Sequence, residues 1–251
     1  MIDKTTPTPR GLRPLTVMVL TALWIATIGN LALWRALAAL PELGNARGLL
    51  FGLAFALMIG AVQVAISSLF AWRWTLKPVL TFMLLAAAAG AYFMLSYGVV
   101  IERSMMVNVL LTDTREAREL LSWRMAGMLA LLGALPVALL WRARLAWPPA
   151  ARQLRNNALT LVAALAVAIA TMGLAFQDLS ATMRNHTQLR YLINPLNSFY
   201  AIATLGEQPI QRNGAAVLPL GEDAHLAPRP PGARPPLVLL VVGETARSDH
   251  Q

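Results

Sequence analysis

Five apolar runs follow one another along the first 175 residues, separated by short polar or basic stretches, and they cover residues 15–37, 49–70, 79–100, 125–141 and 157–175. A helix that crosses a bilayer needs roughly 20 apolar residues, so the pattern predicts five membrane-spanning helices over residues 1–175. The first run is longer than the apolar core of a signal peptide and is predicted to stay as an anchor. The fourth run contains Pro136, which frees a helix carbonyl that a neighbouring helix can satisfy.

The pattern changes after the fifth run. Residues 176–205 mix aromatic, polar and basic positions, as in "RNHTQLRYLINPLN", which favours an interfacial helix on the outer membrane surface, with Pro195 kinking or ending it. Residues 206–236 are rich in Pro and Gly, which predicts a linker. Residues 237–251 begin with an apolar run that predicts a buried strand. The expected fold class is therefore an all-α membrane bundle of five helices, followed by a linker and the first strand of an α/β domain.

Composition and charge support a membrane protein and exclude other classes. Apolar residues make up 57% of the chain and charged residues 13%, whereas about 25% of a soluble domain is charged. The net charge of +9 comes from basic residues between the apolar runs, which indicates topology signals rather than nucleic-acid binding. With the N-terminus in the cytoplasm, the inner loops hold more Lys and Arg than the outer loops, and the part after the fifth run lies outside. The chain has no cysteine, which excludes disulfides and Cys-ligated metals.

A polar stripe is predicted between the third and fourth apolar runs. Asn108, Thr112 and Glu116 are spaced four residues apart, so a helix would place them on one face. Such a stripe could meet a polar lipid headgroup at the membrane surface, with Glu116 attracting a cationic amine. The alternative is an amphipathic surface helix with a solvated face.

Two polar residues, Asn30 and Gln63, fall inside the predicted spans. Uncharged polar side chains at such positions usually hydrogen-bond to neighbouring helices, and we expect this role for both. No charged residue lies deep in a span, which argues against a proton-coupled pump, an ion channel or a small transporter.

The predicted strand ends at Gly243 and Glu244. Sites in open α/β sheets form beyond the carboxyl ends of the strands, and a carboxylate at that place can bind a metal through oxygen. A turn with a solvated glutamate is the simpler interpretation of these residues alone.

The combination of five spans with "NVLLTDTREA", "RNHTQLRYLINPLN" and a strand that ends in "VVGETAR" resembles the lipid A phosphoethanolamine transferases, which include polymyxin (colistin) resistance enzymes of Gram-negative bacteria. The resemblance implies a multi-pass protein of the bacterial inner membrane with a periplasmic domain of the alkaline phosphatase and sulfatase type. It implies transfer of phosphoethanolamine from phosphatidylethanolamine to a lipid A phosphate through a zinc-activated threonine. Glu244 matches the family's zinc-ligating glutamate, and Asn108, Thr112 and Glu116 match residues that line the headgroup pocket.

The resemblance also has a departure. The family's nucleophilic threonine and its other zinc ligands would follow Gln251, so Thr245 does not match the nucleophile. We therefore expect the N-terminal part of a longer enzyme, monomeric and inactive alone, with 237–251 as the start of its catalytic domain. The acceptor stays open between lipid A, a core sugar and another glycan. The alternative function is a non-catalytic membrane anchor or a module that binds phospholipid headgroups.

Overall fold

The computed structural model describes residues 11–99 and 122–207. Five helical runs in these ranges are long and apolar enough to cross a membrane: Pro14–Ala38, Ala46–Leu69, Leu76–Tyr97, Trp123–Arg142 and Ala150–Leu174. The described residues form no strand, and their one isolated bridge joins Leu12 to Leu145. The prediction of an all-α membrane bundle of five helices is confirmed. The predicted strand at 237–251 and the linker at 206–236 lie outside the described residues, apart from the end of the last helix.

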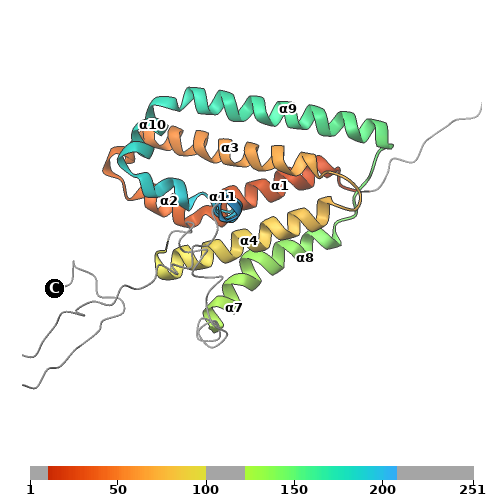
Figure 1. The fold of residues 1–251 in the computed structure, drawn as a ribbon, viewed down its shortest axis with the longest axis horizontal. Helices are drawn as coiled ribbons and strands as arrows, with labels where there is room; N and C mark the ends of the chain where they lie inside the picture. Colours follow the sequence, from red (N-terminus) through yellow and green to blue (C-terminus); the bar gives the residue numbers. More distant parts are fainter. Residues whose placement is uncertain (1–10, 100–121, 208–251) are drawn as a thin grey trace, which may run out of the picture. The chain divides into compact units, whose positions relative to one another are not determined.

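Three membrane helices pack side by side in one part of the bundle (Figure 1). The first span consists of α1 (Pro14–Thr27), the 3₁₀ turn η1 (Ile28–Asn30) and α2 (Leu31–Ala38), and it contacts α3 (Ala46–Leu69). The opposite side of α3 contacts α9 (Ala150–Leu174) along most of its length. On α9 the buried residues Ala164, Ala168 and Thr171 recur at helical spacing, so small side chains face α3 and allow close approach.

The remaining spans pack on the other side of α1. Helix α4 (Leu76–Tyr97) contacts both α1 and the fourth span, which consists of α7 (Trp123–Leu129), the π-helical turn η3 (Ala130–Ala134) and α8 (Leu135–Arg142). The π turn ends two residues before Pro136. The Trp24 indole N–H donates to the Leu132 carbonyl at 3.2 Å, which is the carbonyl four residues before the proline. The prediction that a neighbouring helix satisfies this carbonyl is confirmed.

Helix α9 begins seven residues before the fifth apolar run, at Ala150 rather than at residue 157. Its first turns carry Gln153 and Asn157, which are buried and donate to the Ala71 carbonyl at 3.0 Å each. The Gln153 amide also donates to Asn157 Oδ1 at 2.6 Å. Ala71 lies in the connection between α3 and α4. Because its carbonyl accepts hydrogen bonds from these two side chains, polar residues can form the first turns of α9 before the apolar stretch begins.

The segment after α9 is three short helices rather than one interfacial helix. They are α10 (Phe176–Asn185), the 3₁₀ helix η4 (Thr187–Leu192) and α11 (Leu196–Glu207). Ile193, Asn194 and Pro195 separate the last two, so the helix ends next to the proline that was expected to kink or end it. Leu189 of η4 is buried in a cluster with Leu33, Leu37 and Phe51, so this segment packs on α2 and α3.

Candidate functional site

The candidate site is the end of the bundle that holds both flanks of the predicted polar stripe. Residues 100–121, which include the stripe, lie outside the described residues; Val99 precedes them and Ser122 follows. The Tyr92 hydroxyl and Ser122 Oγ are 3.2 Å apart, and Ser122 Oγ accepts from the Met125 N–H at 3.1 Å as the N-cap of α7. A side-chain contact therefore joins the two sides of the stripe, between the last turns of α4 and the start of α7.

Aromatic residues surround this connection. The Tyr92 ring lies 5.3 Å from Phe93 and 5.9 Å from Tyr97, measured between centroids, in edge-to-face arrangements. Tyr92 is buried, whereas Tyr97 is 49% exposed and Trp123 is 94% exposed. Tyr and Trp concentrate where a membrane helix meets water and headgroups. The aromatic residues indicate that this end of α4 and α7 lies at a membrane–water interface.

A buried network joins the segment after α9 to the first and third spans. Asn30 Nδ2 donates to the Ile25 carbonyl at 2.8 Å and to the Asn194 carbonyl at 2.7 Å, and Asn30 Oδ1 accepts from the Asn194 N–H at 2.8 Å. Asn194 Nδ2 in turn donates to the carbonyls of Gly29 at 2.9 Å and Ala87 at 2.6 Å. Both asparagines are at most 1% exposed. This network holds the connection between η4 and α11 against η1 and α4.

Glycine allows the close approach at this point. A Cβ added to Gly90 would lie 2.9 Å from Asn194 Cγ and 3.0 Å from Asn194 Nδ2, which is closer than packed atoms tolerate. One further contact supports the position of α11, where Phe199 stacks on Phe82 of α4 with centroids 5.5 Å apart. Gly90 therefore allows the segment after α9 to pack this closely on α4, and a side chain at this position would have to displace the Asn194 amide.

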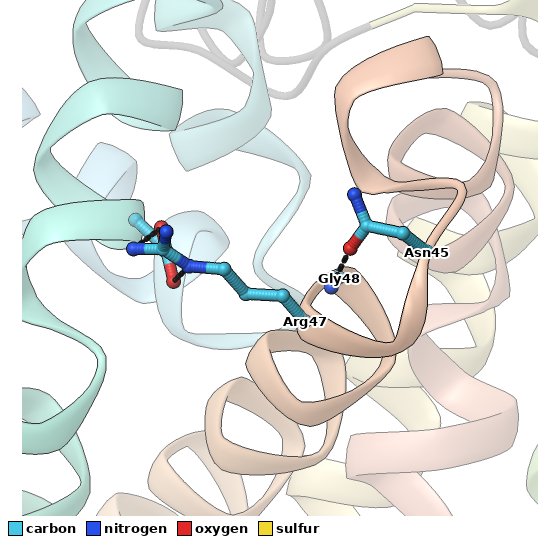
Figure 2. A network of polar contacts seen from close by, with 4 residues as sticks. Asn45, Arg47 and Gly48 are labelled. Atoms are coloured by element: carbon cyan, nitrogen blue, oxygen red, sulfur yellow. Dashed lines mark hydrogen bonds and ion pairs between the residues drawn. The ribbon is translucent and has the colours of Figure 1, made fainter.

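A second, more exposed connection joins α3 to α10 (Figure 2). The Arg47 guanidinium reaches Asp178 through Nη2 to Oδ1 at 2.9 Å and Nε to Oδ2 at 3.1 Å. Next to it, Asn45 caps α3 by accepting from the Gly48 N–H at 2.9 Å. Such an exposed ion pair stabilises a fold only slightly, so the buried asparagine network is the stronger fastening.

The four predicted site residues Asn108, Thr112, Glu116 and Glu244 lie outside the described residues, and their assignments stay predictions. Within 11–99 and 122–207, no three His, Cys, Asp or Glu side chains lie close enough together to hold a metal ion. The described part of the chain therefore does not by itself form a complete zinc site.

The two polar residues predicted inside the spans differ in outcome. Asn30 is hydrogen-bonded as expected, although its distant partner is Asn194 after η4 rather than another span. Gln63 is fully buried, and neither atom of its amide has a partner among the described residues. Sequence reasoning did not single out Asn194. The available signal was an Asn-Pro pair beside an apolar helix, which indicates a turn but not its partner.

Comparisons with known proteins find one matching family model and several related proteins. A family model described as phosphoethanolamine transferase EptA/EptB matches residues 58–210. The phosphatidylethanolamine transferase Mcr-2 of Escherichia coli is 29% identical over 242 residues, which cover 96% of this chain and 45% of Mcr-2. The phosphoethanolamine transferase EptA of Escherichia coli K12 is 30% identical over 245 residues, with 93% of this chain and 43% of EptA covered.

A solved structure has the same fold. It is the integral membrane lipooligosaccharide phosphoethanolamine transferase A of Neisseria meningitidis, with a TM-score of 0.69, 19% identity, and coverage of 76% of this chain and 36% of that one. This likeness concerns the fold, and with the five apolar helices it indicates a multi-pass membrane protein. The chain spans about half the length of the curated relatives that it matches.

Proposed function

Because the chain belongs to the phosphoethanolamine transferase EptA/EptB family, we propose that its membrane helices serve an enzyme that moves phosphoethanolamine from phosphatidylethanolamine to a lipid A phosphate. The observation that carries the proposal is the family match over residues 58–210, which spans the candidate end of the bundle. Curated relatives with phosphatidylethanolamine or phosphoethanolamine transferase in their names support it over almost the whole chain.

The donor headgroup binds, on this proposal, to the polar stripe of Asn108, Thr112 and Glu116. The described residues that flank the stripe support this placement, since Tyr92 and Ser122 fasten its two ends beside exposed interfacial aromatics. Ethanolamine is cationic and a carboxylate near the membrane surface attracts it more strongly than one in bulk water, because the local dielectric constant is lower. Glu116 therefore holds the amine and positions the phosphate.

The transfer proceeds by two displacements in the proposed mechanism. A threonine oxygen attacks the phosphorus of the donor and diacylglycerol leaves; a lipid A phosphate oxygen then attacks the same phosphorus and releases the threonine. No residue of this chain is assigned as that threonine. Glu244 is proposed as one carboxylate ligand of a zinc ion, and zinc bound there stabilises negative charge on phosphoryl oxygens.

The orientation is part of the proposal. We place the protein in the bacterial inner membrane with the starts of α1 and α9 in the cytoplasm and α10 to α11 in the periplasm, as the distribution of Lys and Arg favours. The chain has no cysteine, so single cysteines at exposed positions report the orientation directly. In intact cells, a membrane-impermeant maleimide should label Asn185→Cys and should not label Arg144→Cys. The reverse pattern would invert the topology.

A chimera tests the activity. The part of E. coli Mcr-2 that aligns with this chain is replaced by residues 1–251, and the lipid A of cells without other such transferases is analysed by mass spectrometry. One added phosphoethanolamine group is expected. Glu116→Ala should lower the modified fraction, roughly tenfold to a hundredfold if a charge-assisted hydrogen bond to the amine is lost. Asp113→Ala removes an acid from the same stretch at a position that helical spacing puts off the face of the stripe, and it should leave the fraction unchanged.

Each outcome of this test is decisive. If the chimera reaches the membrane in normal amounts and lipid A stays unmodified while parent Mcr-2 modifies it, the lipid A proposal is wrong. Retained binding of phosphatidylethanolamine in that case would favour a headgroup-binding module without chemistry. Equal effects of Glu116→Ala and Asp113→Ala would contradict the role given to the stripe.

A further inference from the structure

A pocket of about 590 Å³ lies at the end of the bundle where α1 and α9 begin. Its polar lining includes Arg13, Arg152, Asn156 and Trp147. The isolated bridge beside it explains why two distant segments meet there: the Leu12 N–H donates to the Arg144 carbonyl at 2.8 Å, and the Ala146 N–H donates to the Leu12 carbonyl at 3.0 Å. This bridge holds the starts of the first and fifth spans side by side.

The pocket is positively charged. Arg13 and Arg152 are exposed and form no ion pair with any described residue, and no acidic residue is among the lining residues. Helices α1 and α9 start here with no acidic residue in the first turn and no side-chain cap, so the partial positive charge of each helix start adds to the two guanidinium groups. An anion with its charge at the mouth of the pocket fits this field.

An apolar groove continues from the pocket into the membrane. It has a volume of about 700 Å³, is lined by residues of α1, α3 and α9, and shares Leu15, Leu159 and Thr160 with the charged pocket. Gly60 and neighbouring alanines keep the groove hollow, and Leu23 and Leu57 of its lining are more than half exposed. The three helices of the groove are those seen side by side in Figure 1.

We propose that the pocket and the groove together bind one anionic glycerophospholipid, with its phosphate between Arg13 and Arg152 and an acyl chain along α1, α3 and α9. The continuity of a basic pocket with an apolar groove carries the proposal, because a soluble anion would use only the pocket and a neutral lipid only the groove. Basic pockets between membrane helices bind anionic headgroups in this way. In the proposed orientation the lipid belongs to the cytoplasmic leaflet, so it is distinct from the donor lipid at the other end of the bundle.

Native mass spectrometry of the full chain tests the proposal. Detergent-purified protein is mixed with equal amounts of phosphatidylglycerol and phosphatidylcholine of the same acyl length, and the retained lipid is counted. Phosphatidylglycerol should be retained preferentially. In the double variant Arg13→Ala, Arg152→Ala, the preference should fall on the order of tenfold, from the loss of two basic groups at an anionic headgroup. The double variant Arg13→Lys, Arg152→Lys keeps both positive charges and should retain part of the preference for phosphatidylglycerol. Arg155→Ala lies on the same helix, is exposed outside the pocket and should change nothing.

A second variant tests the groove. Competition by inorganic phosphate tests whether the bound anion is a lipid or free phosphate. Gly60→Leu places a larger side chain in the groove, where a Cβ meets only Ala26 Cβ at 3.8 Å, so the fold should tolerate it while phosphatidylglycerol retention falls. Circular dichroism and thermal unfolding confirm that each variant is folded. Unchanged preference in the folded double alanine variant would overturn the proposal. Binding of inorganic phosphate in competition with the lipid, at similar concentration, would overturn the acyl-chain part.

Discussion

Replacing Asn30 by alanine tests whether one buried amide fastens the segment after α9 to the membrane helices. The change removes three hydrogen bonds, to the carbonyls of Ile25 and Asn194 and from the Asn194 N–H. Both groups of Asn194 belong to a residue that is 0% exposed, so water reaches them only if the segment opens. The substitution therefore leaves buried backbone groups without partners.

The magnitude follows from these three bonds. Side-chain hydrogen bonds inside a membrane protein contribute about 0.6 kcal/mol each on average, so three set a lower value of about 2 kcal/mol. Burying two backbone groups without partners costs about 1–3 kcal/mol for each group, so the free energy of unfolding should fall by about 2 to 6 kcal/mol. We also expect local opening at η4 and α11 before the spans unfold.

The assay is unfolding of the purified chain in detergent by increasing dodecyl sulfate, followed by the helical circular dichroism signal. Limited proteolysis in parallel reports whether cleavage begins at residues 186–195. The matched control is Asn185→Ala, an exposed asparagine whose side chain makes no hydrogen bond within the described residues, and it should change the free energy by less than about 0.5 kcal/mol. An Asn30→Ala protein as stable as this control, with unchanged proteolysis, would refute the role of the network.

Gly90→Ala places a methyl group against the Asn194 amide and should lower the free energy of unfolding by about 1–3 kcal/mol in the same assay. The control Gly52→Ala, with no atom within 4 Å of the added Cβ, should be neutral or stabilising. Equal effects of the two substitutions would contradict the close approach of Asn194 to α4. Trp24→Phe removes the indole N–H that donates to the Leu132 carbonyl within η3 and should cost about 1 kcal/mol. The cost should be smaller when Pro136→Ala supplies a helical N–H, so an additive double-mutant cycle would contradict the assignment. Arg47→Ala breaks the exposed ion pair with α10 and should cost less than about 1 kcal/mol at low salt and less still at high salt; a large loss that salt does not reduce would show that the pair is not a surface contact.

The candidate site divides between what the sequence predicts and what the described residues test. The spacing of Asn108, Thr112 and Glu116 predicts a polar stripe, but these residues lie outside the described residues and the stripe stays a prediction. Its flanks are described, and Tyr92 and Ser122 join them. A tyrosine near the end of an apolar run and a serine before the next run carry no signal in the sequence that they contact each other.

The sequence by itself determined the membrane class, the number of spans and the position at which a helix carbonyl lacks a donor within its own helix. Run length decides whether a segment crosses a bilayer, because every backbone group in lipid must be satisfied within the helix. The same rule shows that Pro136 leaves a carbonyl without a helical donor. These properties depend on composition and local backbone chemistry alone, so they can be read from the order of residues.

The tertiary structure decided which residues are the hydrogen-bond partners of polar groups inside the spans. Trp24 donates to Leu132 across 108 positions in the chain, and Asn30 pairs with Asn194 across 164. Periodicity in an apolar helix does not reveal which face turns inward, because lipid and protein interior are similarly apolar and the hydrophobic pattern does not distinguish them. Helix rotation and close approach at small residues such as Gly90 set these partners, and both arise only when the helices pack.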